Sequence, residues 1–269
     1  MTRLPGRLVL IGHPVAHSLS PLFQNAALRR AGIALTYEVF DIAPAKLADA
    51  TRRLRALGAS GNVTVPHKEA FAAFCARLTP IAGRVGAVNT FWTEDGDLVG
   101  DNTDVGGFEE AVAQAFGATR AWRAVAIVGA GGAAAAVAAA VERWAGCRAA
   151  IWSRNGSRSA QLAARFPGVR VAASLEDAVD GADLVVNATP LGLRPGDDLP
   201  VPIQLIAPHA CVYDLVYDRL QTPWVLAARA AGHPAADGLG MLIAQGALAF
   251  ERWFAQAPDR DVMWAAVKG

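Results

Sequence analysis

The sequence predicts an α/β protein with two domains, each built from strands that alternate with helices. The clearest segment is residues 124–140, in which the apolar run Ala124–Val128 precedes a glycine-rich turn and an alanine-rich helix. An uninterrupted apolar run of this length is typical of a strand buried on both faces of a parallel sheet. The alternation of strand and helix recurs on both sides of this segment, and 269 residues are enough for two domains.

In the first hundred residues, apolar runs bounded by glycine and proline indicate the elements. Strands are expected at 8–11, 37–41, 62–65, 87–92 and 98–100. Helices are expected at 20–31, 44–57, 68–75 and 79–85. Ser20 followed by Pro21 is typical of an N-cap with proline at the first helical position. The Asp-Gly pair at 95–96 predicts a hairpin turn between the last two strands.

A helix at 104–116 leads into the glycine-rich segment, and the alternation then continues to the end of the chain. Further strands are expected at 149–152, 169–172, 184–187 and 212–214. Further helices are expected at 157–166, 223–231, 240–254 and 261–267, with a short acidic helix before residue 184. The natural domain boundary lies near Asp101 to Asp104, so we expect the first domain to span 1–102 and the nucleotide unit to begin at 103.

Gly129, Gly131 and Ala134 have the Gly-x-Gly-x-x-Ala spacing of a dinucleotide-binding turn. The first glycine permits a tight turn, the second lets the backbone approach a pyrophosphate, and the small third residue lets the helix pack closely on the sheet. The phosphates then lie at the helix N-terminus. The cofactor contacts expected in this turn are Gly129, Ala130, Gly131, Gly132 and Ala133.

Two other interpretations of this segment stay open. Residues 124–141 are uncharged and long enough for a membrane span, but the three glycines and the small alanines make a poor one. A structural glycine turn without a ligand is the stronger alternative. The flanking strand and helix favour nucleotide binding over both.

The segment after the second strand of the nucleotide unit favours NADP over NAD. A protein that selects NAD usually has Asp or Glu there to hold the ribose 2′-hydroxyl. This chain has Ser153-Arg154-Asn155-Gly156-Ser157-Arg158 instead. Guanidinium groups bind phosphate oxygens as a fork, so Arg154 and Arg158 indicate a 2′-phosphate. The alternative is a solvated loop whose arginines face water.

Composition excludes several classes of function. With 18% charged residues and a formal net charge of +1, the chain has no basic surface for nucleic acid or anionic lipid, so neither is expected as a partner. Its three cysteines have no paired spacing, and the first seven residues lack the apolar core of a signal peptide. We therefore expect a cytoplasmic protein with reduced thiols. The five histidines have no metal-ligand spacing, so no metal site is expected.

Lys68 is one of only three lysines in a chain whose basic charge is carried almost entirely by arginine. It follows a strand and the pair Pro66-His67, at the start of a helix, where the helix dipole disfavours its charge. A lysine held there is a candidate for proton exchange near neutral pH. The alternative is a surface lysine that pairs with Glu69 or a loop carbonyl.

Two polar clusters are also ambiguous. Residues 100–104, Gly-Asp-Asn-Thr-Asp, either bind a ligand or cap the next helix through Asn102 or Thr103. Ser18 and Ser20 have the same two interpretations. Spacing along the chain does not establish whether Lys68 and Asp104 meet in space.

Taken together, seven motifs resemble the shikimate dehydrogenase family along nearly the whole chain, in the family's order and spacing. They are Gly12-His-Pro-Val-Ala-His-Ser-Leu-Ser-Pro21, Asn62-Val-Thr-Val-Pro-His-Lys68, Gly86-Ala-Val-Asn-Thr90, Gly100-Asp-Asn-Thr-Asp104, the glycines at 129–132, Asn187-Ala-Thr189 and Asp237-Gly-Leu-Gly-Met-Leu-Ile-Ala-Gln245. The resemblance implies reversible, NADPH-dependent reduction of 3-dehydroshikimate to shikimate, a step in chorismate and aromatic amino acid biosynthesis.

The resemblance also implies roles for single residues. The catalytic pair falls on Lys68, which handles the proton on the substrate oxygen, and Asp104, which holds the lysine. The implied substrate contacts are Ser18, Ser20, Thr64, Asn89, Tyr217 and Gln245. Beyond the glycine turn, the implied NADP(H) contacts are Ser153, Arg154, Asn155, Arg158, Asn187, Ala188, Thr189, Leu215 and Gly238.

The family's fold returns the C-terminal helices to the first domain. The implied domains are thus 1–102 completed by 238–269, which binds the substrate, and a Rossmann-like domain at 103–237, with the site in the cleft between them. The partner implied is a small-molecule substrate. The chain is expected to be a monomer or a homodimer.

The chain departs from the family pattern at two places. Ser153-Arg154-Asn155 replaces the more usual Asn-Arg-Thr but keeps the arginine, and Gln24-Asn25 replaces a His-Asn pair. A dual quinate/shikimate dehydrogenase stays open as an alternative. A ligand-sensing relative of the same fold would be expected to lose Lys68 or Asp104. Methylene-tetrahydrofolate dehydrogenase fits the polar clusters at 18–20 and 101–104 poorly.

Overall fold

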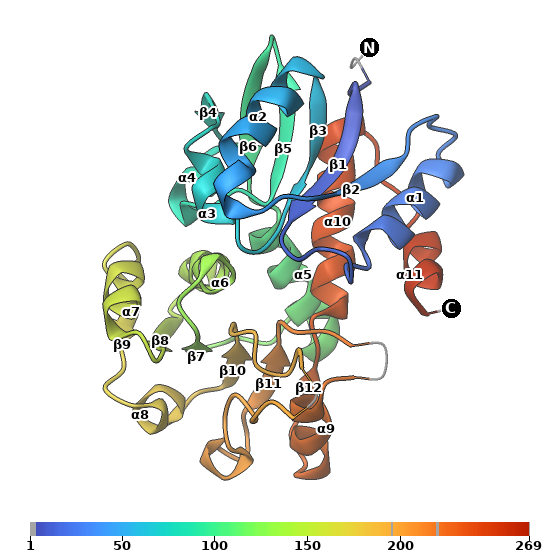
Figure 1. The fold of residues 1–269 in the computed structure, drawn as a ribbon. Coiled ribbons are helices and arrows are strands. Elements are labelled where there is room, and N and C mark those ends of the chain that lie inside the picture. The colour runs from blue at the N-terminus through green and yellow to red at the C-terminus, as the bar shows by residue number, and fades with distance from the viewer. Residues whose placement is uncertain (1–3, 195, 219–220, 269) are drawn as a thin grey trace. The chain divides into compact units, whose positions relative to one another are not determined.

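A computed structural model describes residues 4–194, 196–218 and 221–268 (Figure 1). The chain divides into two compact units. The first comprises Met1–Gly107 and Leu242–Gly269, and the second comprises Phe108–Met241. The described residues form one six-stranded sheet in each unit. The α/β fold class predicted from the sequence is confirmed.

The sheet of the first unit is mixed, with the strand order β2-β1-β3-β5-β6-β4. Its strands are β1 (Arg7–Gly12), β2 (Tyr37–Asp41), β3 (Ala59–Val63), β4 (Arg77–Leu78), β5 (Thr90–Glu94) and β6 (Asp97–Asp101). β5 runs antiparallel to both β3 and β6. The predicted hairpin is confirmed: Asp95 and Gly96 between β5 and β6 have φ of 53° and 82°, which the Asp-Gly pair tolerates.

Helices pack on both sides of this sheet. They are α1 (Ser20–Arg30), α2 (Leu47–Ala56), α3 (Lys68–Ala72), α4 (Pro80–Val85), the start of α5 (Asp104–Phe116), most of α10 (Leu239–Phe254) and α11 (Arg260–Lys268). Leu54 of α2 and Phe71 of α3 share a buried cluster with Val9 and Ile11 of β1. Figure 1 shows α10 on the opposite side of the sheet from α2, and α1 packs against α11.

The sheet of the second unit is entirely parallel, with the order β12-β11-β10-β7-β8-β9. Its strands are β7 (Ala124–Val128), β8 (Arg148–Trp152), β9 (Val169–Val171), β10 (Leu184–Asn187), β11 (Cys211–Asp214) and β12 (Ala235–Ala236). Its further helices are α6 (Gly132–Arg143), α7 (Gly156–Ala163), α8 (Leu175–Val179) and α9 (Pro223–Ala230). The order reverses at β7, and in such sheets ligands bind beyond the carboxyl ends of the strands at the reversal.

The alanine-rich segment is the most deeply buried helix of the second unit. Every residue from Ala134 to Val141 is at most 3% exposed. A helix buried all round needs small apolar side chains to pack closely on the sheet beside β7. Residues 124–141 thus form a strand, a turn and a helix rather than one apolar helix. None of the helices in the described ranges is long and apolar enough to cross a bilayer.

The structure corrects several predicted boundaries. The prediction that Ser20 caps α1 is wrong: Leu19 is the N-cap residue, and the Ser18 hydroxyl accepts the Ser20 N–H at 3.2 Å. Either serine is a suitable capping residue, so the sequence did not discriminate between them. The strand expected from residue 87 begins at Thr90, which frees residues 87–89 from the sheet. β4 and β12 were not predicted, because two residues show no alternation.

Candidate active site

Lys68 and Asp104 form an ion pair in the first unit. Nζ of Lys68 lies 2.7 Å from Oδ2 of Asp104, and the two side chains are 18% and 5% exposed. Each is the first residue of its helix, α3 and α5 respectively. A helix N-terminus favours a carboxylate and disfavours an ammonium, so Asp104 is stabilised at the start of α5 and supplies the countercharge for Lys68 at the start of α3. The structure therefore brings the two predicted catalytic residues together.

Asn89 binds the other oxygen of Asp104. Its Nδ2 donates to Oδ1 of Asp104 at 2.8 Å and lies 3.0 Å from Oγ1 of Thr103. Its Oδ1 accepts the Thr103 N–H at 2.7 Å. Oε1 of Gln245, on α10, lies 3.3 Å from the same Nδ2. Four predicted site residues from separate segments, Lys68, Asp104, Asn89 and Gln245, thus form one hydrogen-bonded group, which we call the lysine group.

A second layer of polar side chains supports the lysine group. Tyr37 donates its hydroxyl to Oδ1 of Asn62 at 2.7 Å. Nδ2 of Asn62 reaches the backbone oxygen of Asn89 at 3.1 Å and Oγ1 of Thr90 at 3.0 Å. Burial raises the pKa of Tyr37 well above its usual value, so it stays a donor. The sequence predicted no role for Tyr37 or Thr90. Asn62, a polar residue within a buried strand, was a signal that polar partners such as these lie nearby.

Ser18 lies in the loop between β1 and α1, Ser20 is the first residue of α1, and Thr64 follows β3. Ser20 is only 6% exposed, and its N–H already bonds to Ser18. The carbonyl of Thr64 accepts the N–H of His67 at 2.9 Å, so Thr64 is fixed in the turn that leads into Lys68. Within the described part of the chain, none of the three side chains is hydrogen-bonded to the lysine group.

The glycine turn of the second unit leaves open space at the N-terminus of a helix. Gly129 has φ of 118°, and a Cβ there would lie 2.6 Å from the carbonyl oxygen of Ala188, so only glycine fits. Gly131 is the N-cap of α6, and a Cβ there would meet no atom within 4 Å. The open space at Gly131, next to free N–H groups of the helix N-terminus, is where backbone and phosphate can approach.

The loop after β8 is organised by its own short side chains. Oγ of Ser153 bonds to the carbonyl oxygen of Asn155 at 2.9 Å and lies 2.8 Å from Oγ of Ser159. Asn155 is the N-cap of α7 and accepts the N–H of Arg158 at 3.2 Å. Arg154 is exposed between them. The loop shape is thereby fixed by Ser153 and Asn155, on either side of the exposed Arg154.

Asn187 and Asp214 join the ends of β10 and β11. Nδ2 of Asn187 donates to Oδ1 of Asp214 at 2.8 Å, and Oδ1 of Asn187 accepts both the N–H and the hydroxyl of Thr189. Asp214 also accepts the N–H of Val216 at 3.0 Å and the hydroxyl of Thr222 at 2.7 Å. Burial raises the pKa of Asp214 to about 6. Sequence reasoning missed Asp214 and Thr222, although an acid that ends an apolar strand was a usable signal.

The remaining candidates lie on the loops after β10, β11 and β12. The backbone N–H groups of Ala188, Leu215 and Gly238 are all hydrogen-bonded to neighbouring carbonyls. A Cβ on Gly238 would lie 2.3 Å from the carbonyl oxygen of Leu215, so glycine is required for this close approach. Tyr217 follows on the same loop and is partly buried.

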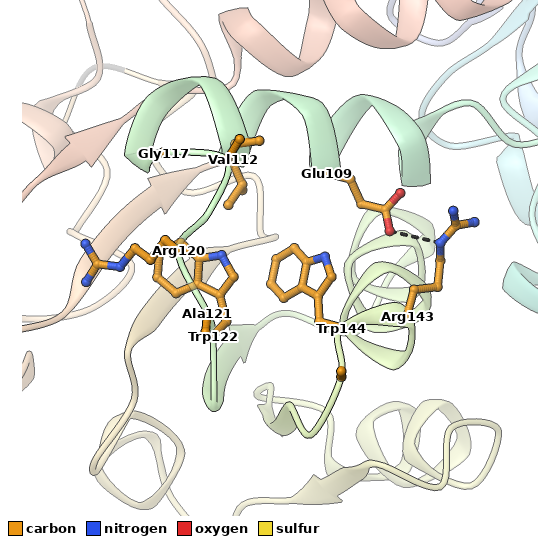
Figure 2. A pocket seen from close by; sticks show the side chains of 11 residues that line it. Glu109, Val112, Gly117, Arg120, Ala121, Trp122, Arg143 and Trp144 are labelled. Carbon is orange, nitrogen blue, oxygen red and sulfur yellow. Dashed lines mark ion pairs between the residues drawn. The ribbon is translucent and has the colours of Figure 1, made fainter.

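A cavity of about 390 Å³ in the second unit lies elsewhere (Figure 2). It is bordered by α5, by the end of α6 and by the segment before β7, and its lining includes Trp122, Trp144 and the ion pair between Glu109 and Arg143 at 3.0 Å. The two indole rings stack with centroids 6.1 Å apart. None of the predicted site residues lines it. The cavity lies near the amino end of β7, whereas the glycine turn follows the carboxyl end.

Within the described ranges, no group of three or more His, Cys, Asp or Glu side chains could hold a metal ion. The three cysteines are free. Burial raises the pKa of Cys75 to about 12 and that of Cys147 to about 11, so little thiolate forms at neutral pH.

Known proteins resemble the chain over its full length. Two family models match: the shikimate dehydrogenase substrate binding domain at residues 10–91 and the shikimate 5′-dehydrogenase C-terminal domain at residues 238–268. A shikimate dehydrogenase (NADP(+)) from Moorella thermoacetica is 43% identical over 96% of this chain and 91% of its own length. The chain belongs to the shikimate dehydrogenase family.

Solved shikimate dehydrogenases have the same fold. The enzyme from Aquifex aeolicus has a TM-score of 0.91 at 34% identity, covering 98% of each chain. Shikimate 5-dehydrogenase from Thermus thermophilus, solved in complex with NADP(H) and shikimate, has a TM-score of 0.88 at 40% identity, covering 97% of this chain and 98% of its own. The family predicted from the sequence motifs is confirmed.

Proposed function

We propose that this chain carries out the reaction of its family, the reversible NADPH-dependent reduction of 3-dehydroshikimate to shikimate, and that the lysine group is its catalytic centre. The observation that carries the assignment of the centre is the buried 2.7 Å pair of Lys68 and Asp104. A lone lysine is a common surface feature. A lysine whose partner is a nearly buried carboxylate, fixed from its other side by Asn89, is a positioned proton donor.

When bound, NADPH would supply the hydride that reduces the carbonyl carbon of the substrate. As the carbonyl π bond breaks, Lys68 donates a proton from Nζ to the oxygen, which becomes the hydroxyl of shikimate. Asp104 keeps Nζ in place through Oδ2, while Asn89 prevents the carboxylate from rotating by binding Oδ1. In the oxidative direction, Lys68 accepts the same proton. A proton carrier held in this way contributes about 10²–10⁴-fold to the rate.

The substrate has a carboxylate and several hydroxyls, which require short polar side chains. We assign the carboxylate to the hydroxyls of Ser18 and Ser20. We assign the ring hydroxyls to Thr64, Asn89 and Gln245, of which Asn89 and Gln245 already bond to each other. Tyr217 is a further contact in this proposal.

For the cofactor, the pyrophosphate contacts fall on the turn from Gly129 to Ala133, because Gly131 leaves open space at the N-terminus of α6. The 2′-phosphate contacts fall on Arg154 and Arg158, with Ser153 and Asn155 shaping the loop. We assign the contacts with the nicotinamide part of the cofactor to the loops that carry Ala188, Thr189, Leu215 and Gly238. Free thiols are consistent with a reducing compartment, and we place the protein in the cytoplasm.

The test is a spectrophotometric assay that crosses shikimate and quinate with NADP⁺ and NAD⁺. We expect turnover chiefly with shikimate and NADP⁺. Comparable turnover of quinate would replace this proposal with a dual quinate/shikimate dehydrogenase. Absence of turnover in all four pairings, from protein that still binds NADPH, would replace it with a ligand-sensing relative of the family.

A further inference from the structure

Among the described acidic residues of the first unit that form ion pairs, Asp101 has the most deeply buried side chain. Its side chain is 1% exposed, and Oδ2 accepts from Nε of Arg252 at 2.8 Å. Oδ1 accepts from the hydroxyl of Thr79 and from the N–H of Asn102. A buried carboxylate needs both a countercharge and satisfied oxygens, and Arg252 supplies the only cation within ion-pair distance in the described part of the chain.

Asp101 is connected to the catalytic carboxylate through one residue. Asn102 donates its N–H to Asp101 at 2.8 Å, and its side-chain oxygen accepts the N–H of Asp104 at 3.1 Å. Nδ2 of Asn102 also donates to the carbonyl of Ala87 at 2.9 Å. The turn between β6 and α5 is therefore built on the Asp101 carboxylate, and this turn determines where Asp104 meets Lys68.

Arg252 is well placed to hold this turn from α10. It lies seven residues after Gln245, two helical turns along the same face of α10. Gln245 contacts Asn89, and Arg252 contacts Asp101, so one helix contacts both the lysine group and the turn that precedes Asp104. Arg252 is itself 57% exposed, so its guanidinium closes the turn from the solvent side and fills no space in the core.

We propose that Arg252 is a positioning residue for the reaction: through Asp101 and Asn102 it fixes Asp104, and thereby Lys68, in the geometry for proton transfer. This inference rests on the proposed function. It assigns Arg252 no contact with substrate or cofactor. Without the guanidinium, the buried Asp101 carboxylate keeps only neutral donors, and the turn it organises shifts toward water. A displacement of about 1 Å in a catalytic group costs about 10²-fold in rate.

The chain offers a matched control at the other end of the same strand. Arg55 pairs with Asp97, the first residue of β6, at 2.7 Å. Arg55 is 58% exposed, almost the same as Arg252, but Asp97 is 46% exposed whereas Asp101 is 1% exposed. Arg55→Met and Arg252→Met thus remove the same group from the two ends of β6. Both keep an apolar stem for packing.

The experiment compares wild type, Arg252→Met, Arg252→Lys and Arg55→Met in steady-state kinetics, NADPH binding and amide hydrogen exchange. For Arg252→Met we expect kcat to fall about 10–100-fold, while KM for shikimate and Kd for NADPH stay within about threefold of wild type. Amide exchange in the peptide covering residues 100–108 should accelerate. Arg252→Lys, which keeps the charge, should recover most of kcat, and Arg55→Met should match wild type throughout.

A purely structural role for Arg252 would lower Tm with kcat per folded molecule unchanged, and that result would overturn the proposal. Equal losses in Arg252→Met and Arg55→Met would also overturn it. If Arg252→Met does not fold, Arg252→Gln, which still donates one neutral hydrogen bond, is compared in the same way. Failure of the proposed function is distinct, because it would show as absence of turnover in the wild type while the exchange difference between the two Met variants persisted.

Discussion

Asn89 and Lys68 bind opposite oxygens of one carboxylate: Nδ2 of Asn89 lies 2.8 Å from Oδ1 of Asp104, and Nζ of Lys68 lies 2.7 Å from Oδ2. The carboxylate cannot turn away from the lysine without breaking the bond to the amide. Because Asp104 is nearly buried, water does not replace either partner easily. One buried carboxylate thereby holds both side chains, which is the arrangement that the proposed proton transfer by Lys68 requires.

Lys68→Ala should lower kcat by about 10²–10⁴-fold, because the variant has no group to deliver the proton. NADP(H) affinity should stay near wild type, since the residues assigned to the cofactor lie in the other unit. Lys46→Ala is the control, because Lys46 is an exposed lysine of the same unit. Near-normal turnover of Lys68→Ala would refute the assignment of the proton carrier.

Two glycines of the nucleotide turn should respond differently to alanine. Gly131→Ala should fold normally, because a Cβ there meets no atom within 4 Å, but it should bind NADPH weakly because the methyl occupies the space for the pyrophosphate. Gly129→Ala should lose about 1–3 kcal/mol of stability or more, because of its positive φ and the 2.6 Å contact with Ala188. Tm and fluorescence titration with NADPH measure the two effects. Normal NADPH affinity in Gly131→Ala would contradict the proposed cofactor position.

Arg154→Ala should reduce the preference for NADPH over NADH. Loss of a charged hydrogen bond to the 2′-phosphate costs about 1.5–3 kcal/mol, which raises the dissociation constant for NADPH roughly 10–150-fold. The dissociation constant for NADH should not change. Arg148→Ala is the matched control, because Arg148 is an exposed arginine at the other end of β8. An equal loss for NADPH and NADH would mean that Arg154 does not contact the 2′-phosphate.

The contribution of the Asp214 carboxyl to the free energy of unfolding should decrease as the pH rises. Its folded pKa of about 6 exceeds the usual value of 3.8, so between these values the folded chain binds more protons than the unfolded chain. The contribution of Asp214 to the free energy of unfolding is therefore fully present below pH 3.8 and is lost as the pH rises through 6. The total loss is about 3 kcal/mol. Asp214→Asn removes this dependence.

Urea unfolding of wild type and Asp214→Asn from about pH 4 to 7.5 measures the difference. The stability of wild type relative to the variant should decline across this window. Asp177→Asn is the control, because hydrogen bonding from Arg170 lowers the pKa of Asp177 from its usual 3.8, so the contribution of Asp177 to stability changes mainly below about pH 4 and its difference from wild type should stay nearly constant across this window. Parallel stability curves for wild type and Asp214→Asn would contradict the raised pKa.

Most of the fold could be predicted because it is encoded locally. Alternating apolar runs and glycine boundaries predicted most helices and strands to within a few residues, and the Asp-Gly pair predicted the hairpin of β5 and β6. The exceptions had physical causes. Ser18 and Ser20 are equally suitable capping residues, so the sequence assigned the cap of α1 to Ser20, whereas the N-cap residue is Leu19. The two-residue strands β4 and β12 exist only because neighbouring strands pair with them.

The sequence by itself determined the family, the glycine turn and the identity of the candidate catalytic residues, because these depend on residue types at fixed spacing. Only the tertiary structure decided that Lys68 and Asp104, 36 residues apart, share a hydrogen bond. It also decided that Asp101 is buried against Arg252 while Asp97, on the same strand, is exposed. These relationships depend on the order of the strands within the sheet and on which helix packs against the strand ends. Spacing along the chain does not record that packing.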